Sequence, residues 1–124
     1  MVPVSRWFKL ACWLMAALFA LCVALQYNDP DPIRWMVIYG VAMVLSVLLP
    51  IQRDAAKAGL VAGLAALVWT VVLLIPIWDT VSPSDAFLKM SEKGGAVEEL
   101  REAGGLAIEG VWLVLASWYR LRRA

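Results

Sequence analysis

The sequence predicts an all-α integral membrane protein, a bundle of four transmembrane helices in one domain over residues 1–124. Hydrophobic residues make up 63% of the chain and charged residues 17%, far from the averages of soluble domains. The apolar residues also fall in long uninterrupted stretches, and about 20 apolar residues of helix are needed to cross a bilayer core of about 30 Å. These stretches lack the alternation of membrane-spanning strands.

Charged residues delimit four predicted spans, at about 10–26, 33–51, 59–78 and 102–120. The first three carry a single charge between them, Arg34, and the fourth contains Glu109. The last helix is expected to begin outside the membrane, within "AVEELREA", and to continue into it. Outer loops are expected at 27–32 and 79–101, and a cytoplasmic link at 52–58. Within the longer loop, residues 82–93 are expected to form a short amphipathic helix on the outer surface.

The basic residues give the orientation. Seven of the eleven lie on one predicted side: Arg6, Lys9, Arg53, Lys57, Arg120, Arg122 and Arg123. Eight of the ten acidic residues lie on the other: Asp29, Asp31, Asp79, Asp85, Glu92, Glu98, Glu99 and Glu102. By the positive-inside rule both termini are cytoplasmic, in a multi-pass protein of the plasma or inner membrane. The first span could instead be a signal peptide, although its apolar run is long for one.

Cysteine and histidine usage argues against redox or metal chemistry. Cys12 and Cys22 are ten residues apart on one predicted helix, about 15 Å along its axis and beyond disulfide reach. The chain has no histidine, the commonest ligand of haem, zinc and copper sites. We therefore expect no cofactor and assign no metal site.

The segment "QYNDPDPIRW", residues 26–35, interrupts the apolar runs. Pro32 suits the first position of a helix and Asp31 its N-cap, while Pro30 helps to end the first span. The aromatic residues here are expected at the membrane interface: Tyr27, Trp35 and Tyr39. A tight helical hairpin therefore accounts for most of the segment.

That hairpin does not explain the polar residues gathered on the outer face. Glu98, Glu102 and Glu109 fall on one stripe of a helix, and an intramembrane carboxylate such as Glu109 normally faces a partner or a water-filled cavity. The candidate cluster comprises Gln26, Asn28, Asp29, Asp31, Arg34, Glu98, Arg101, Glu102 and Glu109. It could bind a hard cation or a proton, or its acids could pair with the arginines. Glu109 could also be a protonated or snorkelling glutamate near the interface.

Two blocks carry a resemblance to a known family. "LMAALFALCVALQYNDPDPIRWMVIYG", residues 14–40, and "EELREAGGLAIEGVW", residues 98–112, are similar to the transmembrane protein 220 family of small four-span membrane proteins. The matching residues are Gln26, Asn28, Asp29, Pro30, Asp31, Trp35, Tyr39, Glu98, Glu99, Arg101, Glu102, Gly105, Leu106 and Trp112. The family's biochemical activity is undefined, so the resemblance implies a membrane-spanning fold and no catalytic residue.

The remaining residues predict packing and partners. Gly59 and Gly63 form a small-xxx-small pair that allows close helix approach within the bundle or with another subunit, and Gly105 is a further packing position. The basic tail "RLRR" adjoins the last span, which favours the membrane surface over nucleic acid.

We expect a scaffold or accessory subunit in a larger membrane complex. It would contact the lipid bilayer and a protein partner or a second copy through its transmembrane helices. The alternative is an ion- or proton-binding transporter or channel component that uses the acidic outer-face cluster. An enzyme is not expected, since no catalytic constellation or nucleotide motif is present.

Overall fold

The computed structural model describes residues 3–28, 31–82, 84–85 and 96–123. Over these residues the chain is helical, without strands, which confirms the predicted all-α class. The elements are, in order, α1 (Arg6–Leu25), the 3₁₀ turn η1 (Gln26–Asn28), α2 (Pro32–Leu48), α3 (Ala55–Leu74), the 3₁₀ turn η2 (Ile75–Ile77) and α4 (Ala96–Leu121). The amphipathic helix predicted over 82–93 falls mostly outside the described residues.

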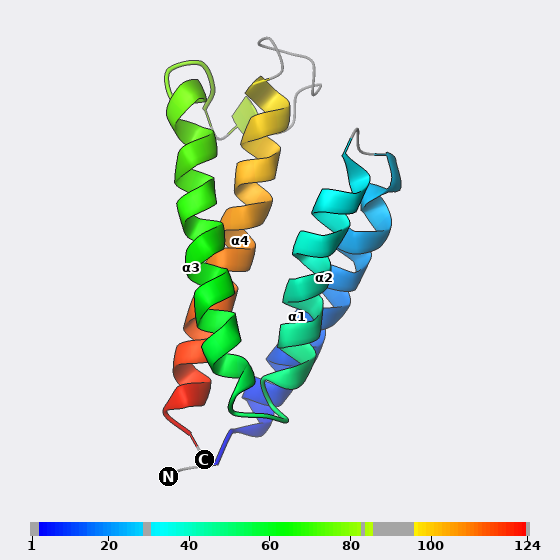
Figure 1. Ribbon diagram of the computed structural model, residues 1–124, viewed down its shortest axis with the longest axis vertical. Coiled ribbons are helices and arrows are strands. Elements are labelled where there is room, and N and C mark those ends of the chain that lie inside the picture. Colours follow the sequence, from blue (N-terminus) through cyan, green and yellow to red (C-terminus); the bar gives the residue numbers. More distant parts are fainter. Residues whose placement is uncertain (1–2, 29–30, 83, 86–95, 124) are drawn as a thin grey trace.

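The helices form two antiparallel hairpins, α1–α2 and α3–α4 (Figure 1). The contact between α3 and α4 is the most extensive, and α2 makes most of the contact between the hairpins. The hairpins meet where both chain termini and the α2–α3 link lie, and they diverge toward the other end (Figure 1). We call the first the basic end, after the seven arginines and lysines named above, and the second the open end.

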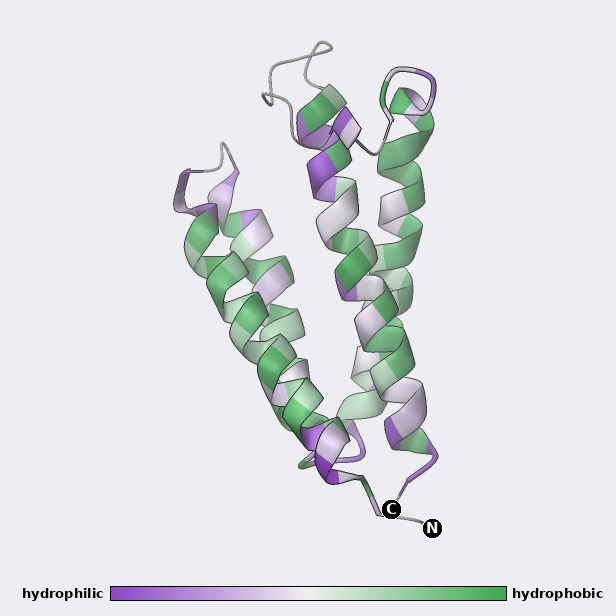
Figure 2. Cartoon of the chain, turned by 180° about the vertical axis from the view of Figure 1, so that it is seen from behind, coloured by the Kyte–Doolittle hydropathy of each residue, from purple (hydrophilic) through white to green (hydrophobic). Residues whose placement is uncertain are grey.

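The helices consist largely of hydrophobic residues along most of their length, with hydrophilic residues gathered mainly near the ends (Figure 2). Large side chains such as Val61, Val68 and Leu115 are 70%, 64% and 58% exposed, and apolar surface on this scale is rare in soluble proteins. Two segments, Arg6–Asn28 and Ala55–Ile77, are long and apolar enough to cross a membrane. The helix α2 is apolar but shorter, at 17 residues.

Local signals set the helix ends. Ser5 caps α1, because its hydroxyl accepts a hydrogen bond from the Phe8 N–H at 3.0 Å. Pro32 is the first residue of α2, as expected, but Asp31 makes no side-chain cap hydrogen bond. The helices α1, α3 and α4 begin at positions 6, 55 and 96, before the predicted spans. Charge marks the edge of the apolar run, whereas the helical backbone continues beyond it.

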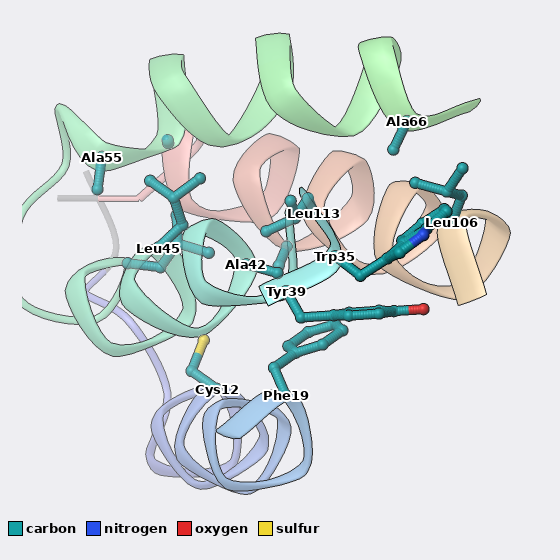
Figure 3. Close-up of a cluster of buried hydrophobic side chains, with 13 residues drawn as sticks. Cys12, Phe19, Trp35, Tyr39, Ala42, Leu45, Ala55, Ala66, Leu106 and Leu113 are labelled. Carbon is teal, nitrogen blue, oxygen red and sulfur yellow. The ribbon is translucent and has the colours of Figure 1, made fainter. Parts of the chain in front are cut away.

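The core contains aromatic side chains that the sequence analysis placed at the membrane interface (Figure 3). Trp35 and Tyr39 are only 2% and 8% exposed and pack inside the bundle, while Tyr27 is 68% exposed. The depth of these rings in the membrane stays a prediction. Trp35 and Tyr39 lie four residues apart, on the same face of α2. The Trp35 ring stacks on Trp69 of α3 at 5.7 Å, and the Tyr39 ring stacks on Phe19 of α1 at 6.4 Å.

Small residues permit the close approach of α3 and α4. A Cβ atom added at Gly63 would lie 2.8 Å from Val114 Cγ2 and 3.0 Å from the carbonyl oxygen of Gly110. Gly59 similarly lies against the Ser117 hydroxyl of α4, and Gly105 against the Tyr39 hydroxyl of α2. The two glycines of the small-xxx-small pair therefore face a helix of the same chain.

Candidate functional site

Apart from Asp29 and Glu109, the residues of the predicted outer-face cluster belong to two separate elements at the open end (Figure 1). One set belongs to the α1–α2 hairpin: Gln26, Asn28, Asp31 and Arg34. The other occupies the first turns of α4: Glu98, Arg101 and Glu102. Asp29 lies outside the described residues. Within the described part of the chain, no three or more aspartate, glutamate or cysteine side chains are grouped so that they could hold a metal ion.

The polar residues of the first hairpin make local contacts. The Gln26 side-chain Nε2 donates to the Cys22 carbonyl at 2.9 Å, which satisfies a carbonyl in the last turn of α1. Arg34 Nε lies 3.0 Å from Asp31 Oδ2 in a half-exposed ion pair. The Arg34 guanidinium also lies over the rings of Trp35 and Trp69, at 5.5 and 5.6 Å. Arg34 thus connects the two hairpins.

The acidic residues at the start of α4 suit their position in the helix. Glu98 and Glu99 are in its first turn, where a negative charge interacts favourably with the positive end of the helix dipole. Arg101 and Glu102, in the second turn, each take part in an interaction of their own. Glu98 and Glu99 therefore have a role in stabilising the helix.

Glu109 differs from every other member of the cluster. It lies 13 residues after the start of α4 and 12 before its end, is only 3% exposed, and its Oε2 has no hydrogen-bond partner among the described residues. Leaving a buried polar atom unpaired costs free energy that native structures usually avoid. An unpaired carboxyl in the middle of an apolar helix therefore marks a candidate site.

A cavity of about 230 Å³ adjoins Glu109. Three helices line it: α2 with Val37, Ile38 and Val41, α3 with Ala62, Ala65, Ala66 and Trp69, and α4 with Leu106 and Glu109. Glu109 is the one ionisable residue among these nine. The cavity thus presents a single carboxyl group in otherwise apolar walls, which is the usual composition of a binding pocket with one orienting polar contact.

The cavity continues into a groove between α2 and α3 that leads toward the basic end. A second cavity of about 520 Å³ shares Val37, Val41 and Ala62 with the first and is otherwise lined by Gly40, Met43, Val44, Leu45 and Ala58. A Cβ atom added at Gly40 would meet no heavy atom within 4 Å. We call the two cavities together the α2–α3 groove.

Residue size and the position of α2 explain why the groove is open. The α3 wall consists largely of alanines, whose side chains are too short to reach α2. The neighbouring face of α2 is held against α4, since Trp112 Nε1 donates to the Ser46 hydroxyl at 3.0 Å. Near Gly40, where an added Cβ would meet no heavy atom within 4 Å, the space between α2 and α3 therefore stays unfilled.

The sequence analysis missed a polar network at the basic end. Arg120 is 6% exposed and its Nε donates to the Leu49 carbonyl at 2.7 Å, which satisfies the C-cap residue of α2. Arg53 Nη2 donates to the Leu121 carbonyl at 2.6 Å, and the Ser5 N–H donates to the Tyr119 hydroxyl at 3.2 Å. The run "RLRR" gave no signal that its first arginine is buried.

Comparison with known proteins bears on the same residues. The family model described as Transmembrane family 220, helix, matches residues 18–118. The matched region contains Glu109 and all the residues of the α2–α3 groove, and it ends before Arg120. No solved structure matches the chain.

Proposed function

Because the chain belongs to transmembrane family 220, a family of membrane proteins, we propose that it is a multi-pass accessory subunit of a larger membrane complex. In this proposal the α2–α3 groove receives a transmembrane helix of the partner protein. The resemblance that the sequence analysis identified in two short blocks extends over most of the chain, and it brings no catalytic residue with it.

The proposal places all four helices across the bilayer. At 1.5 Å per residue, α4 with its 26 residues is about 39 Å long and α2 with its 17 residues about 25 Å. Both lengths are within reach of a hydrocarbon core of about 30 Å, given tilt and local thinning. The concentration of arginine and lysine at the basic end favours a cytoplasmic location for that end and for both termini.

The observation that carries the proposal is an apolar groove that opens sideways from the bundle. Transmembrane helices associate where small residues let backbones approach closely, and the groove offers such residues on both walls, Gly40 on α2 and Ala58 and Ala62 on α3. A helix lying there would cover the groove and come within reach of Glu109.

Gentle-detergent purification of groove variants tests the proposal. Gly40→Trp would place an indole ring in the groove, where no heavy atom lies within 4 Å of the new Cβ, whereas Leu64→Trp places the same side chain at a 51% exposed position on another face of α3. We expect one protein to co-purify with the wild type and with Leu64→Trp and to be lost from Gly40→Trp. Recovery of all three as the same lone homo-oligomer would contradict the proposal.

Glu109 also favours a second candidate, an ion- or proton-binding component of a transporter or channel. Its buried, unpaired oxygen near the middle of α4 is the observation in its favour. Purified protein in liposomes would then support a proton or sodium flux that Glu109→Gln abolishes. If the wild type and this variant leak equally, the second candidate fails and the accessory function is unaffected.

A further inference from the structure

We infer that the helix received in the α2–α3 groove carries a basic side chain, a lysine or an arginine, whose charged group enters the cavity and pairs with Glu109. The inference rests on the proposed function and specifies the chemistry of the partner. It follows from the position of Glu109, from the contacts of the chain's own basic residues, and from the composition of the cavity.

Position decides what kind of molecule can reach the carboxyl. Glu109 is at the middle of α4, and the wall residues Val41 and Ala62 are also well inside their helices. A lipid headgroup stays at the bilayer surface, so it does not extend to this depth. A side chain of a neighbouring transmembrane helix reaches it directly, because such a helix would lie along the groove beside the cavity.

Basic groups of the bundle are occupied by other partners, and Arg101, on the same helix as Glu109, takes part in an interaction of its own. Arg34 pairs with Asp31 and lies over two tryptophan rings. Arg120 donates to a backbone carbonyl at the far end of the bundle. Among the described residues no ion pair to Glu109 is found, and its Oε2 accepts no hydrogen bond. The described residues therefore supply no counter-charge for Glu109, and a basic side chain of a partner helix would provide one.

The composition of the cavity favours a cation over a neutral polar group. Eight of the nine lining residues are apolar, so nothing else in the cavity solvates the carboxylate. A buried charge of this kind is stabilised by an opposite charge with good geometry. Lysine and arginine also have apolar stems that can lie along apolar walls while the charged end reaches its partner. A single basic residue would therefore both occupy the cavity and give the Glu109 carboxylate an ion-pair partner.

Designed transmembrane peptides test the inference without knowledge of the natural partner. Three alanine–leucine helices would carry lysine, glutamine or leucine at the central position, with a fluorescent acceptor at one end. The donor-labelled protein would be reconstituted with each peptide in phosphatidylcholine vesicles, and association would be measured by energy transfer. We expect the lysine peptide to bind the wild type about tenfold more tightly than the leucine peptide, with glutamine between them.

Variants of the protein identify the site of binding. Glu109→Gln is expected to remove the preference for lysine, and Gly40→Trp to weaken binding of all three peptides. Glu109→Lys with a peptide carrying a central glutamate is expected to restore tight binding by the reversed charge pair. This reversal also guards against the case in which Glu109→Gln fails to fold.

The outcomes separate the inference from the proposed function. If the three peptides bind the wild type equally and Gly40→Trp abolishes their binding, the inference of a basic side chain is wrong. The proposal that the groove receives a helix would still stand. A lysine preference that persists in Glu109→Gln would likewise overturn the inference. Binding of no peptide, or binding unaffected by Gly40→Trp, would overturn both.

Discussion

At the basic end the bundle is joined by directional hydrogen bonds, whereas at the open end the hairpins meet through aromatic rings. Arg120, Arg53 and Ser5 each take part in a hydrogen bond between distant parts of the chain, so the start of α1, the end of α2 and the α2–α3 link are all joined to the end of α4. Toward the open end the hairpins meet through Trp35 and Trp69, which stack at 5.7 Å, with Arg34 over the second ring. Between these regions α2 and α3 leave a groove.

The difference shows how a small bundle can have a defined structure and still keep an unfilled surface. Hydrogen bonds to helix-terminal carbonyls satisfy groups that would otherwise be buried without partners, and they fix the position of each helix at one end. Farther along, the alanines of α3 are too short to close the space beside α2. The groove is therefore a consequence of side-chain size and not of weak helices.

The largest loss of stability is expected when the Arg120 hydrogen bond at the basic end is removed. Arg120→Met retains the apolar bulk but leaves the Leu49 carbonyl without its charged donor. We expect the free energy of unfolding to fall by about 1.5 to 3 kcal/mol, the usual range for a hydrogen bond to a charged group. Titration with a denaturing detergent measures it. Arg122→Met is the matched control, because Arg122 is exposed and lies over Trp118; equal losses in both variants would refute a special role for Arg120.

A smaller loss is expected from separating α3 and α4. In Gly63→Ala the added Cβ would lie 2.9 Å from the Val114 backbone nitrogen as well as close to Gly110. Backbone atoms cannot move away by a change of rotamer, so the two helices must shift. We expect this shift to lower the free energy of unfolding by about 1 to 3 kcal/mol. Gly104→Ala is the control, since no heavy atom lies within 4 Å of its new Cβ. A thermal unfolding series in detergent that ranks the two variants equally would contradict this packing.

The smallest effect has the opposite sign and concerns the groove. Glu109→Met replaces an unpaired buried carboxyl by an apolar side chain, and we expect the free energy of unfolding to rise by about 1 to 2 kcal/mol. The same variant should lose the preference for the lysine peptide. Ile108→Met, on a 62% exposed position of the neighbouring face, should change neither quantity. A lower stability in Glu109→Met would mean that the carboxyl already has a stabilising partner within the protein.

Local features of the sequence predicted much of this architecture. Long apolar runs predicted helices, because the period and length of a run depend on nearby residues alone. Pro32 predicted the start of α2, and the two blocks at residues 14–40 and 98–112 identified the family. The position of Glu109 within an apolar run already singled it out as a candidate functional residue.

Features that depend on how helices cross could not be predicted in this way. Trp35 and Tyr39 are residue types that are common at membrane interfaces. They are buried in the bundle because α2 lies between α1 and the α3–α4 hairpin. Arg120 stands in a run of basic residues, and its burial depends on the carbonyl of Leu49 across the bundle. The groove arises because alanines of α3 lie opposite one face of α2. Which residues of two helices face each other cannot be predicted from the sequence of either helix alone.

Photo-crosslinking in native membranes tests most directly whether the α2–α3 groove receives a partner helix. A photoreactive amino acid would replace Val41, which lines both cavities and is 43% exposed, or Leu64, which is 51% exposed on another face of α3. We predict a crosslink to one protein partner from position 41, absent from position 64 and abolished by Gly40→Trp in the same chain. Crosslinks from position 41 to lipid alone would contradict the account.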